Sequence, residues 1–212
     1  MALTVRQYVT ADGKRPFLEW VRSLTKAVGA RIQLRVQRFE LGNLGDHKNV
    51  GEGVWEARVM FGPGYRIYFG KDGDSIIVLL IGGDKGSQAK DIARARGFWR
   101  ATIWRRNGMA RRHEDWNIGL AEDLRDPEFA REFLLGAIDE EVPLQVALGK
   151  VVRAMGVKEF AAKVGMASPN LLRTLNPRHN PTQDTLNRLL KPFRLKLSLA
   201  PISDRPKRRH AA

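Results

Sequence analysis

Apolar and polar residues alternate with a period of two in neighbouring stretches of the first half, residues 54–61 and 65–71, which a glycine–proline–glycine turn joins. Such alternation predicts strands with one buried face, because successive side chains in a strand point to opposite sides. A third stretch, residues 75–81, is apolar at almost every position. This is typical of a strand at the centre of a sheet, which we expect helices to cover on one side. The three stretches predict an antiparallel meander.

Helical periodicity flanks this meander. Residues 3–9 alternate weakly and predict an edge strand, while residues 16–24 and 27–41 place apolar residues three or four apart and predict two helices. Residues 87–104, which begin at a serine able to cap a helix, predict a third. The order strand, helix, helix, meander, helix predicts a small α+β domain with an antiparallel sheet over residues 1–104.

The second face of the two alternating strands is polar. Glu56 and Arg58 share it on the first strand, Arg66 and Tyr68 on the second, and Lys85 follows the third strand. We expect an exposed cluster in which the three cations can bind a phosphate group while Glu56 or Tyr68 transfers a proton, the requirements of metal-independent RNA cleavage. The alternative is a set of surface ion pairs, each worth less than about 1 kcal/mol. His47, in a predicted turn, is expected to be a loop residue.

The pattern changes after residue 104. Residues 105–115 are charged and lack apolar periodicity, which predicts a linker. Asp126 followed by Pro127 predicts the start of an acidic helix, because aspartate caps helix ends and proline fits the first turn. Residues 142–155 predict another helix. We therefore expect a second, all-α domain over residues 116–200.

Residues 157–176 have the spacing of a helix-turn-helix, with Gly165 in the turn and Ser168 as the cap of the second helix. The following helix is expected to begin after Thr182. Residues 195–199 alternate again and predict a short terminal strand, and the basic tail, residues 201–212, is expected to be disordered.

The second helix of this motif is expected to bury both Leu171 and Leu172. Its outer face and the loop that follows carry polar and basic side chains suited to base edges and phosphates. The expected DNA contacts are Ser168, Pro169, Asn170, Arg173 and Arg178. Helix-turn-helix proteins usually bind two DNA half-sites as dimers, so we expect a homodimer. The alternative is an ordinary helical bundle without a DNA-binding role.

Charge is unevenly distributed in a chain whose formal net charge is +14. Residues 1–104 hold 17 Lys and Arg against 10 Asp and Glu, residues 116–141 hold 2 against 8, and residues 142–201 hold 10 against 2. Basic blocks of this size favour nucleic acid as a partner. The acidic segment between them suggests intramolecular docking, and we expect it to cover the basic face around Arg58, Arg66 and Lys85.

Several classes of protein find no support in the sequence. The absence of cysteine excludes disulfides and thiolate metal sites and suits the cytoplasm. No apolar run of about 18 residues predicts a membrane segment. Neither metal-ligand spacing nor a nucleotide-binding fingerprint occurs, so we expect no metal and no cofactor.

Two long motifs resemble known families. LGNLGDHKNVGEGVWEARVMFGPGYRIYF, followed by GGDKGSQAKDIARA, resembles toxins of the RelE/ParE superfamily, in the phage-derived subgroup allied to HigB. WNIGLAEDLRDPEFAREFL, together with a helix-turn-helix region ending in NPTQDTLNRLLKPFRLKLS, resembles HigA-like addiction-module antidote proteins. The two resemblances cover residues 1–104 and 116–200.

These resemblances imply a type II toxin–antitoxin pair fused in one chain. The toxin half would be an endoribonuclease that cleaves mRNA on the ribosome, with basic residues matching Arg58, Arg66 and Lys85. The antitoxin half would inhibit it, within or between chains, and bind operator DNA to repress its own transcription. Some relatives use a C-terminal tyrosine or histidine, and none occurs in residues 86–104. Two alternatives stay open: a DNA-binding regulator with an inactive toxin-like half, and a ParE-like gyrase inhibitor.

Overall fold

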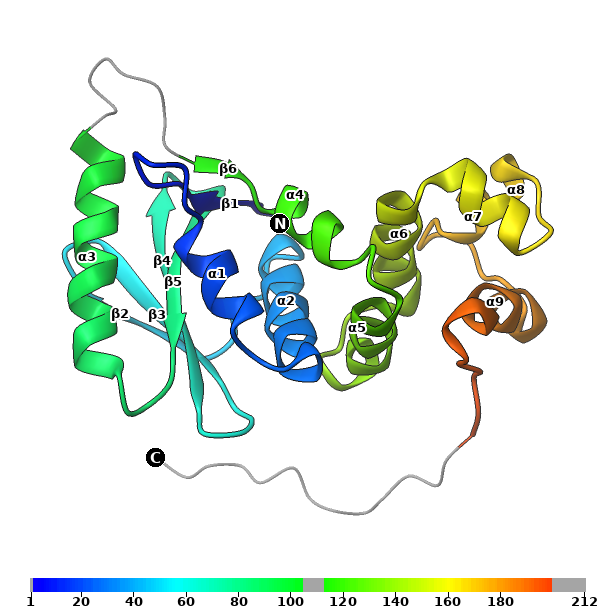
Figure 1. Ribbon diagram of the computed structural model, residues 1–212, viewed down its shortest axis with the longest axis horizontal. Coiled ribbons are helices and arrows are strands. Elements are labelled where there is room, and N and C mark those ends of the chain that lie inside the picture. The colour runs from blue at the N-terminus through cyan, green and yellow to red at the C-terminus, as the bar shows by residue number, and fades with distance from the viewer. Residues whose placement is uncertain (1, 105–112, 200–212) are drawn as a thin grey trace.

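A computed structural model describes residues 2–104 and 113–199 and has a mixed α+β architecture. Figure 1 shows the sheet and α3 at one end of the molecule, α7 to α9 at the other, and α4 to α6 between them. The predicted tail and the linker up to residue 112 lie outside the described residues.

The described strands form one six-stranded sheet in the order β2-β3-β4-β5-β1-β6. The predicted meander is confirmed, because β2 to β5 pair antiparallel in sequence order. The sheet is nevertheless mixed, since β1 runs parallel to β5. The strands are β1 (Thr4–Tyr8), β2 (His47–Gly51), β3 (Val54–Val59), β4 (Tyr65–Asp72), β5 (Ile76–Gly83) and β6 (His113–Asp115).

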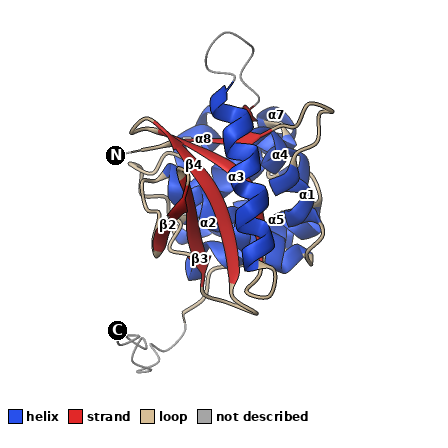
Figure 2. Ribbon diagram, turned by 90° about the vertical axis from the view of Figure 1, so that its left-hand side faces the viewer, coloured by secondary structure: helices blue, strands red, loops and turns tan. Residues whose placement is uncertain are grey.

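Three strand expectations were wrong. Strand β1 is not an edge strand, because β6 pairs with its free side, and β6 is formed by the last three residues of the predicted linker. His47 is not in a loop, because it opens β2 and pairs with Ala57. Strand β5 is covered on both faces, by α1 on one side and by α3 on the other, and Figure 2 shows α3 lying across the sheet.

The three helices of the first half confirm the predicted elements: α1 (Pro16–Arg22), α2 (Lys26–Glu40) and α3 (Gln88–Trp104). Two glycines let tryptophans lie close to the sheet. A Cβ on Gly82 would lie 2.0 Å from the ring of Trp20, and one on Gly70 would lie 2.2 Å from the ring of Trp99. Both distances are too short for a side chain larger than hydrogen.

The helices of the second half follow in close succession. They are α4 (Trp116–Asp123), α5 (Pro127–Asp139), α6 (Leu144–Met155), α7 (Val157–Lys163), α8 (Ser168–Thr174), α9 (Gln183–Leu190) and a 3-10 helix (Lys191–Phe193). The caps predicted at Asp126 and Thr182 are confirmed, because each side chain accepts a hydrogen bond from a backbone N–H of the first turn.

Three local expectations in this half were wrong. Ser168 is the first residue of α8 and makes no cap, because the helix begins one residue earlier than expected. Leu172 is exposed, since it lies about 100° around α8 from the buried Leu171 and so points away from the core. Residues 195–199 form no strand, because no other strand among the described residues pairs with them.

One apolar core extends through both halves of the chain. It includes Phe17 and Phe39 from the first half together with Phe133 and Leu148 from the second. Trp116, the first residue of α4, is fully buried, and its indole Nε1–H donates a hydrogen bond of 2.5 Å to Gln33 Oε1 on α2. Residues that are 83 positions apart therefore share a buried contact.

Trp116→Ala is expected to lower the free energy of unfolding by about 3–5 kcal/mol, because it leaves a large cavity and deprives Gln33 of its donor. Urea denaturation of the full chain measures the change. Ile118→Ala is the control, because Ile118 is largely exposed on the same helix and should change stability by under about 0.5 kcal/mol. Equal effects of the two substitutions would contradict a shared core centred on Trp116.

Candidate functional site

A buried carboxylate lies at the centre of the polar cluster on β3 and β4. Arg58 lies directly across from Arg66 in the strand register, and Glu56 lies directly across from Tyr68. Opposed like charges destabilise a sheet. Glu56 reduces that repulsion, because its carboxylate oxygens lie 3.7 Å from Arg58 Nε and 3.5 Å from Arg66 Nε.

The cluster is less open than expected. Glu56 and Tyr68 are both fully buried, on the side of the sheet where α3 packs. Gln88, the first residue of α3, donates a hydrogen bond of 2.7 Å from Nε2 to Glu56 Oε2, and Tyr68 donates one of 3.3 Å from its hydroxyl to the same oxygen. The expectation of an exposed acid or base was therefore wrong, because the first turn of α3 contributes to covering the carboxylate.

Burial determines what Tyr68 can do. Desolvation, reinforced by the nearby Glu56 charge, raises the pKa of the Tyr68 hydroxyl above its usual range. Tyr68 therefore stays protonated at neutral pH and can donate a proton or a hydrogen bond but not act as a base.

The accessible part of the cluster is cationic. The Arg58 side chain is 43% exposed, and that of Arg66 only 11%. Lys48 on β2, which sequence analysis missed, is 48% exposed and places its Nζ 3.7 Å from Glu56 Oε1. Lys48 pairs with Glu56 across β2 and β3, and this pairing could not be inferred from the sequence because β2 was not predicted. Arg58 also pairs with Asp46, at 3.4 Å from Nη1 to Oδ2, so three cations face two carboxylates. The cluster therefore keeps a single excess positive charge for an anionic ligand.

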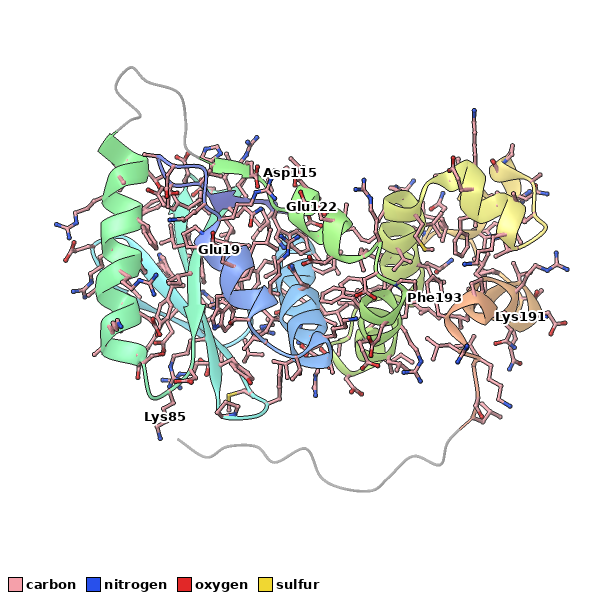
Figure 3. All side chains as sticks on the ribbon, viewed as in Figure 1. Glu19, Lys85, Asp115, Glu122, Lys191 and Phe193 are labelled. Atoms are coloured by element: carbon pink, nitrogen blue, oxygen red, sulfur yellow. The ribbon has the colours of Figure 1, made fainter. Side chains whose placement is uncertain are left out.

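Lys85 does not join this cluster within the described residues. It is exposed between β5 and α3, and its side chain projects outward from that end of the molecule (Figure 3). The structure thus brings together Glu56, Arg58, Arg66 and Tyr68 and leaves Lys85 beyond them.

The acidic segment docks on a different surface from the expected one. Its carboxylates pair with a row of basic residues along α1 and α2. We call this row, with its acidic partners, the charged interface. Its basic members are Arg15, Arg22, Lys26, Arg31 and Arg38, and its acidic members are Glu122, Asp123, Asp126, Glu128, Glu140 and Glu141.

The distances in the charged interface are short at its α4 end. Arg15 Nη1 lies 3.0 Å from Glu122 Oε1, Arg22 Nη2 lies 2.7 Å from Asp123 Oδ1, and Lys26 Nζ lies 2.7 Å from Asp126 Oδ2. No described residue of the acidic segment forms an ion pair with Arg58, Arg66 or Lys85. The expectation that this segment covers the polar face was wrong, because α1 and α2 offer a longer complementary row.

The pKa values of three acids in the charged interface are shifted, two downward by hydrogen bonds from basic side chains and one upward by burial. Hydrogen bonds from Arg22 and Arg15 lower the pKa of Glu122, and a hydrogen bond from Lys26 lowers that of Asp126. Burial instead raises the pKa of Asp123, despite its bond to Arg22. Glu122 and Asp126 are thus favoured in the charged form, whereas Asp123 carries a desolvation cost.

A second candidate surface lies where α8 meets α9. A groove of about 490 Å³ is lined by polar and basic residues that include Asn170, Arg173, His179, Thr185 and Arg188. Of the expected DNA contacts, Asn170 and Arg173 line this groove; Pro169 and Arg178 are exposed outside it, and Ser168 is partly buried. Sequence analysis missed Thr185 and Arg188, because their contribution depends on how α9 packs beside α8.

One residue of α6 holds the loop after α8. The two N–H groups of the Gln145 side-chain amide are shared among three carbonyl oxygens, at 3.1 Å from Thr174, 3.2 Å from Asn176 and 2.8 Å from His179. These bonds connect α6 to the C-terminal end of α8 and to the chain that follows it, beside the groove.

Neither a membrane-spanning helix nor a metal-binding cluster occurs in the described part of the chain. No helix there is both long enough and apolar enough to cross a bilayer. No group of three or more His, Asp or Glu side chains among the same residues is placed to hold a metal ion.

Comparison with known proteins finds similarity for part of the chain. Residues 114–201 match a family described as "Probable addiction module antidote protein". An uncharacterised protein of Haemophilus influenzae is 40% identical over 97 residues, which are 45% of this chain and 92% of that protein. No solved structure matches the chain significantly.

The charged interface predicts acid sensitivity. Because the folded-state pKa values of Glu122 and Asp126 lie below their ordinary values of 4.5 and 3.8, the stabilisation by these groups is complete above those values and is lost as the pH falls through the lowered ones. The free energy of unfolding should therefore fall below about pH 4.5, and this fall should be smaller in the Glu122→Gln/Asp126→Asn double variant. Urea denaturation at a series of pH values measures both.

Asparagine at position 126 keeps the helix cap, so the double variant isolates charge from capping. Asp139→Asn, at an exposed acid of α5, is the control and should leave the acid-induced fall unchanged. If the free energy of unfolding depended on pH identically in the wild type and the double variant, the assignment of acid sensitivity to Glu122 and Asp126 would be refuted.

Proposed function

We propose that this chain, which belongs to the same family as the uncharacterised Haemophilus influenzae protein and matches the antidote family over residues 114–201, is a toxin and its antitoxin fused in one polypeptide. The antidote match supports an antitoxin role for the second half. The observation that carries the fusion is the docking of this half on the first: it supplies β6, buries Trp116 and lines up its acids along α1 and α2.

In this proposal the first half is a metal-independent endoribonuclease that cleaves mRNA on the ribosome. Arg58, Arg66 and Lys48 would stabilise the negative charge that develops on the phosphate, and such electrostatic stabilisation usually contributes most to catalysis of this kind. Glu56 and Tyr68 would hold the arginines in place, because both lie beneath the accessible surface. Lys85 would contact RNA outside the cluster.

The charged interface suggests how the antitoxin half inhibits. Without its acidic partners, the row from Arg15 to Arg38 would be a strongly basic surface suited to ribosomal RNA. The carboxylates of α4 and α5 neutralise this row. We therefore place inhibition at the RNA-docking surface on α1 and α2 rather than at the arginine cluster.

A second candidate is a DNA-binding regulator whose toxin-like half is inactive. The burial of Glu56 and Tyr68 favours it, because the expected acid and base are both withdrawn from the surface. The remaining alternative is a gyrase inhibitor. Like the inactive regulator it would not cleave RNA, but its first half would act on gyrase.

Residues 1–104 expressed alone are expected to arrest growth and to degrade mRNA in a translation extract, and co-expression of residues 113–200 should restore growth. Arg58→Ala should reduce cleavage at least about tenfold, because one charged donor to the developing phosphate charge is lost. Lys90→Ala is the matched control, since Lys90 is an exposed cation on α3 outside the cluster.

Circular dichroism must establish that the fragment is folded, because it lacks β6 and part of the shared core. A folded fragment that neither arrests growth nor cleaves RNA would favour the inactive regulator. Inhibition of gyrase without RNA cleavage would favour the gyrase inhibitor.

The second half, in this proposal, also binds operator DNA through α8 as a homodimer. Arg173→Ala should weaken specific binding by roughly 1–3 kcal/mol if the guanidinium reads a base, with the loss concentrated at one base pair. Titration of full-length protein with operator variants in the promoter region of its own gene measures this. Lys163→Ala, at an exposed cation of α7, is the control and should weaken binding to all sequences equally or not at all.

A further inference from the structure

The segment from Leu195 to Leu199 has the side-chain pattern of a strand without a partner strand among the described residues. Leu195 and Leu197 are partly buried against the apolar core, while Lys196 and Ser198, which each follow one of them, are exposed. Leu199 continues the apolar side of the alternation, yet it is 100% exposed. Alternation of this kind is stable when the apolar side is covered, and here its last member is not.

The two backbone edges of this segment differ in hydrogen bonding, because only one of them is bonded to α9. On one edge, the Leu197 N–H donates to Asn187 Oδ1 at 2.7 Å and the Leu197 carbonyl accepts from Gln183 Nε2 at 3.5 Å, both from α9. Because both the N–H and the C=O of Leu197 face α9, we place the N–H and C=O groups of Lys196 and Ser198 on the opposite edge, as the alternation of an extended chain requires. These four groups have no hydrogen-bond partner within the described part of the chain.

We infer that this free edge pairs with the same edge of a second copy of the chain, to form a two-stranded antiparallel ribbon across a two-fold axis at Leu197. In this register Lys196 of each copy exchanges both backbone hydrogen bonds with Ser198 of the other, and the two Leu197 residues face each other in a pair without hydrogen bonds. A two-fold axis requires such a self-complementary patch.

Charge and apolar surface agree with this register. Lys196 lies across from Ser198 and not across from another lysine, so no like charges are opposed. Leu199 lies across from Leu195 of the other copy, on the same side of the ribbon as the partly buried leucines. The exposed leucine thereby gains an apolar neighbour that the described part of a single chain does not give it.

The ribbon would also orient the proposed DNA-binding surfaces. Asn187 and Gln183, which bind its inner edge, belong to the same helix as Thr185 and Arg188 of the groove. Pairing of two copies would therefore hold two grooves in a fixed relation. The inference rests on the proposed function only for this consequence, since the pairing itself follows from backbone and side-chain geometry.

The test compares full-length Ser198→Pro with full-length Ser198→Ala by sedimentation equilibrium. Proline removes the cross-chain N–H donor of residue 198, which makes no hydrogen bond within the described chain, whereas alanine keeps it. Wild-type protein and Ser198→Ala should dimerise with dissociation constants within about twofold of each other. Ser198→Pro should weaken dimerisation at least about tenfold, because two donors per dimer are lost.

A cysteine scan gives a second readout that does not depend on the proline variant folding. The chain has no native cysteine. Under mild oxidation Leu197→Cys should form a covalent dimer, because facing residues in such a pair lie about 4.5 Å apart at Cα, within disulfide range. Lys196→Cys should do so much less, because its counterpart is displaced along the ribbon.

A monomeric wild-type chain, a dimer that Ser198→Pro leaves unchanged while circular dichroism shows the fold intact, or equal cross-linking of the two cysteine variants would overturn the inference. DNA binding is measured on the same samples. A ribbon-linked dimer that binds no DNA would refute the proposed DNA-binding role and support the ribbon. A monomer that binds DNA would support the DNA-binding role and refute the ribbon.

Discussion

The packing of α4 and α5 against α2 is the constraint on which the arrangement of this protein depends. Trp116 buries its indole against α2 and bonds to Gln33 there. Gly136 on α5 lets the helices approach closely, because a Cβ at that position would lie 2.8 Å from Leu34. Since Trp116, Gln33 and Leu34 are all fully buried, the first half of the chain presents α2 to the second half rather than to solvent.

This packing also determines which charges meet. Once α5 lies along α2, the acids at both of its ends are brought opposite Lys26, Arg31 and Arg38. Surface ion pairs are individually weak, so the row is better understood as selecting the orientation of the two halves than as the source of their affinity. The burial of apolar surface supplies most of the stabilisation.

No described residue of the second half forms an ion pair with the arginines of the cluster on β3 and β4. Its geometry is set within the first half, where Glu56 separates two opposed arginines and the first residue of α3 bonds to that carboxylate. The buried Glu56 carboxylate gathers three cations beside it, and Asp46 pairs with one of them, so the accessible surface of the cluster stays positively charged. This preorganisation is the property that a phosphate-binding surface requires.

Sequence alone predicted the elements whose signal is local. The meander, the helices of the first half and the caps at Asp126 and Thr182 follow from alternation, periodicity and capping chemistry, which act between residues close in sequence. The same kind of signal placed Glu56 and Arg58 of one strand beside Arg66 and Tyr68 of the next on one face of the sheet. It did not find β2 or β6, because each is short and is defined only by the strand that it pairs with.

Tertiary structure decided the rest. Whether Glu56 is exposed depends on where α3 packs, and which basic surface the acidic segment meets depends on the docking of α5, because burial and long-range ion pairing arise only when distant segments come together. Residues 195–199 show most directly where prediction from the sequence ends and tertiary structure decides. Their sequence determined an alternating pattern, but a strand requires a neighbouring strand, and the described part of a single chain contains none for them.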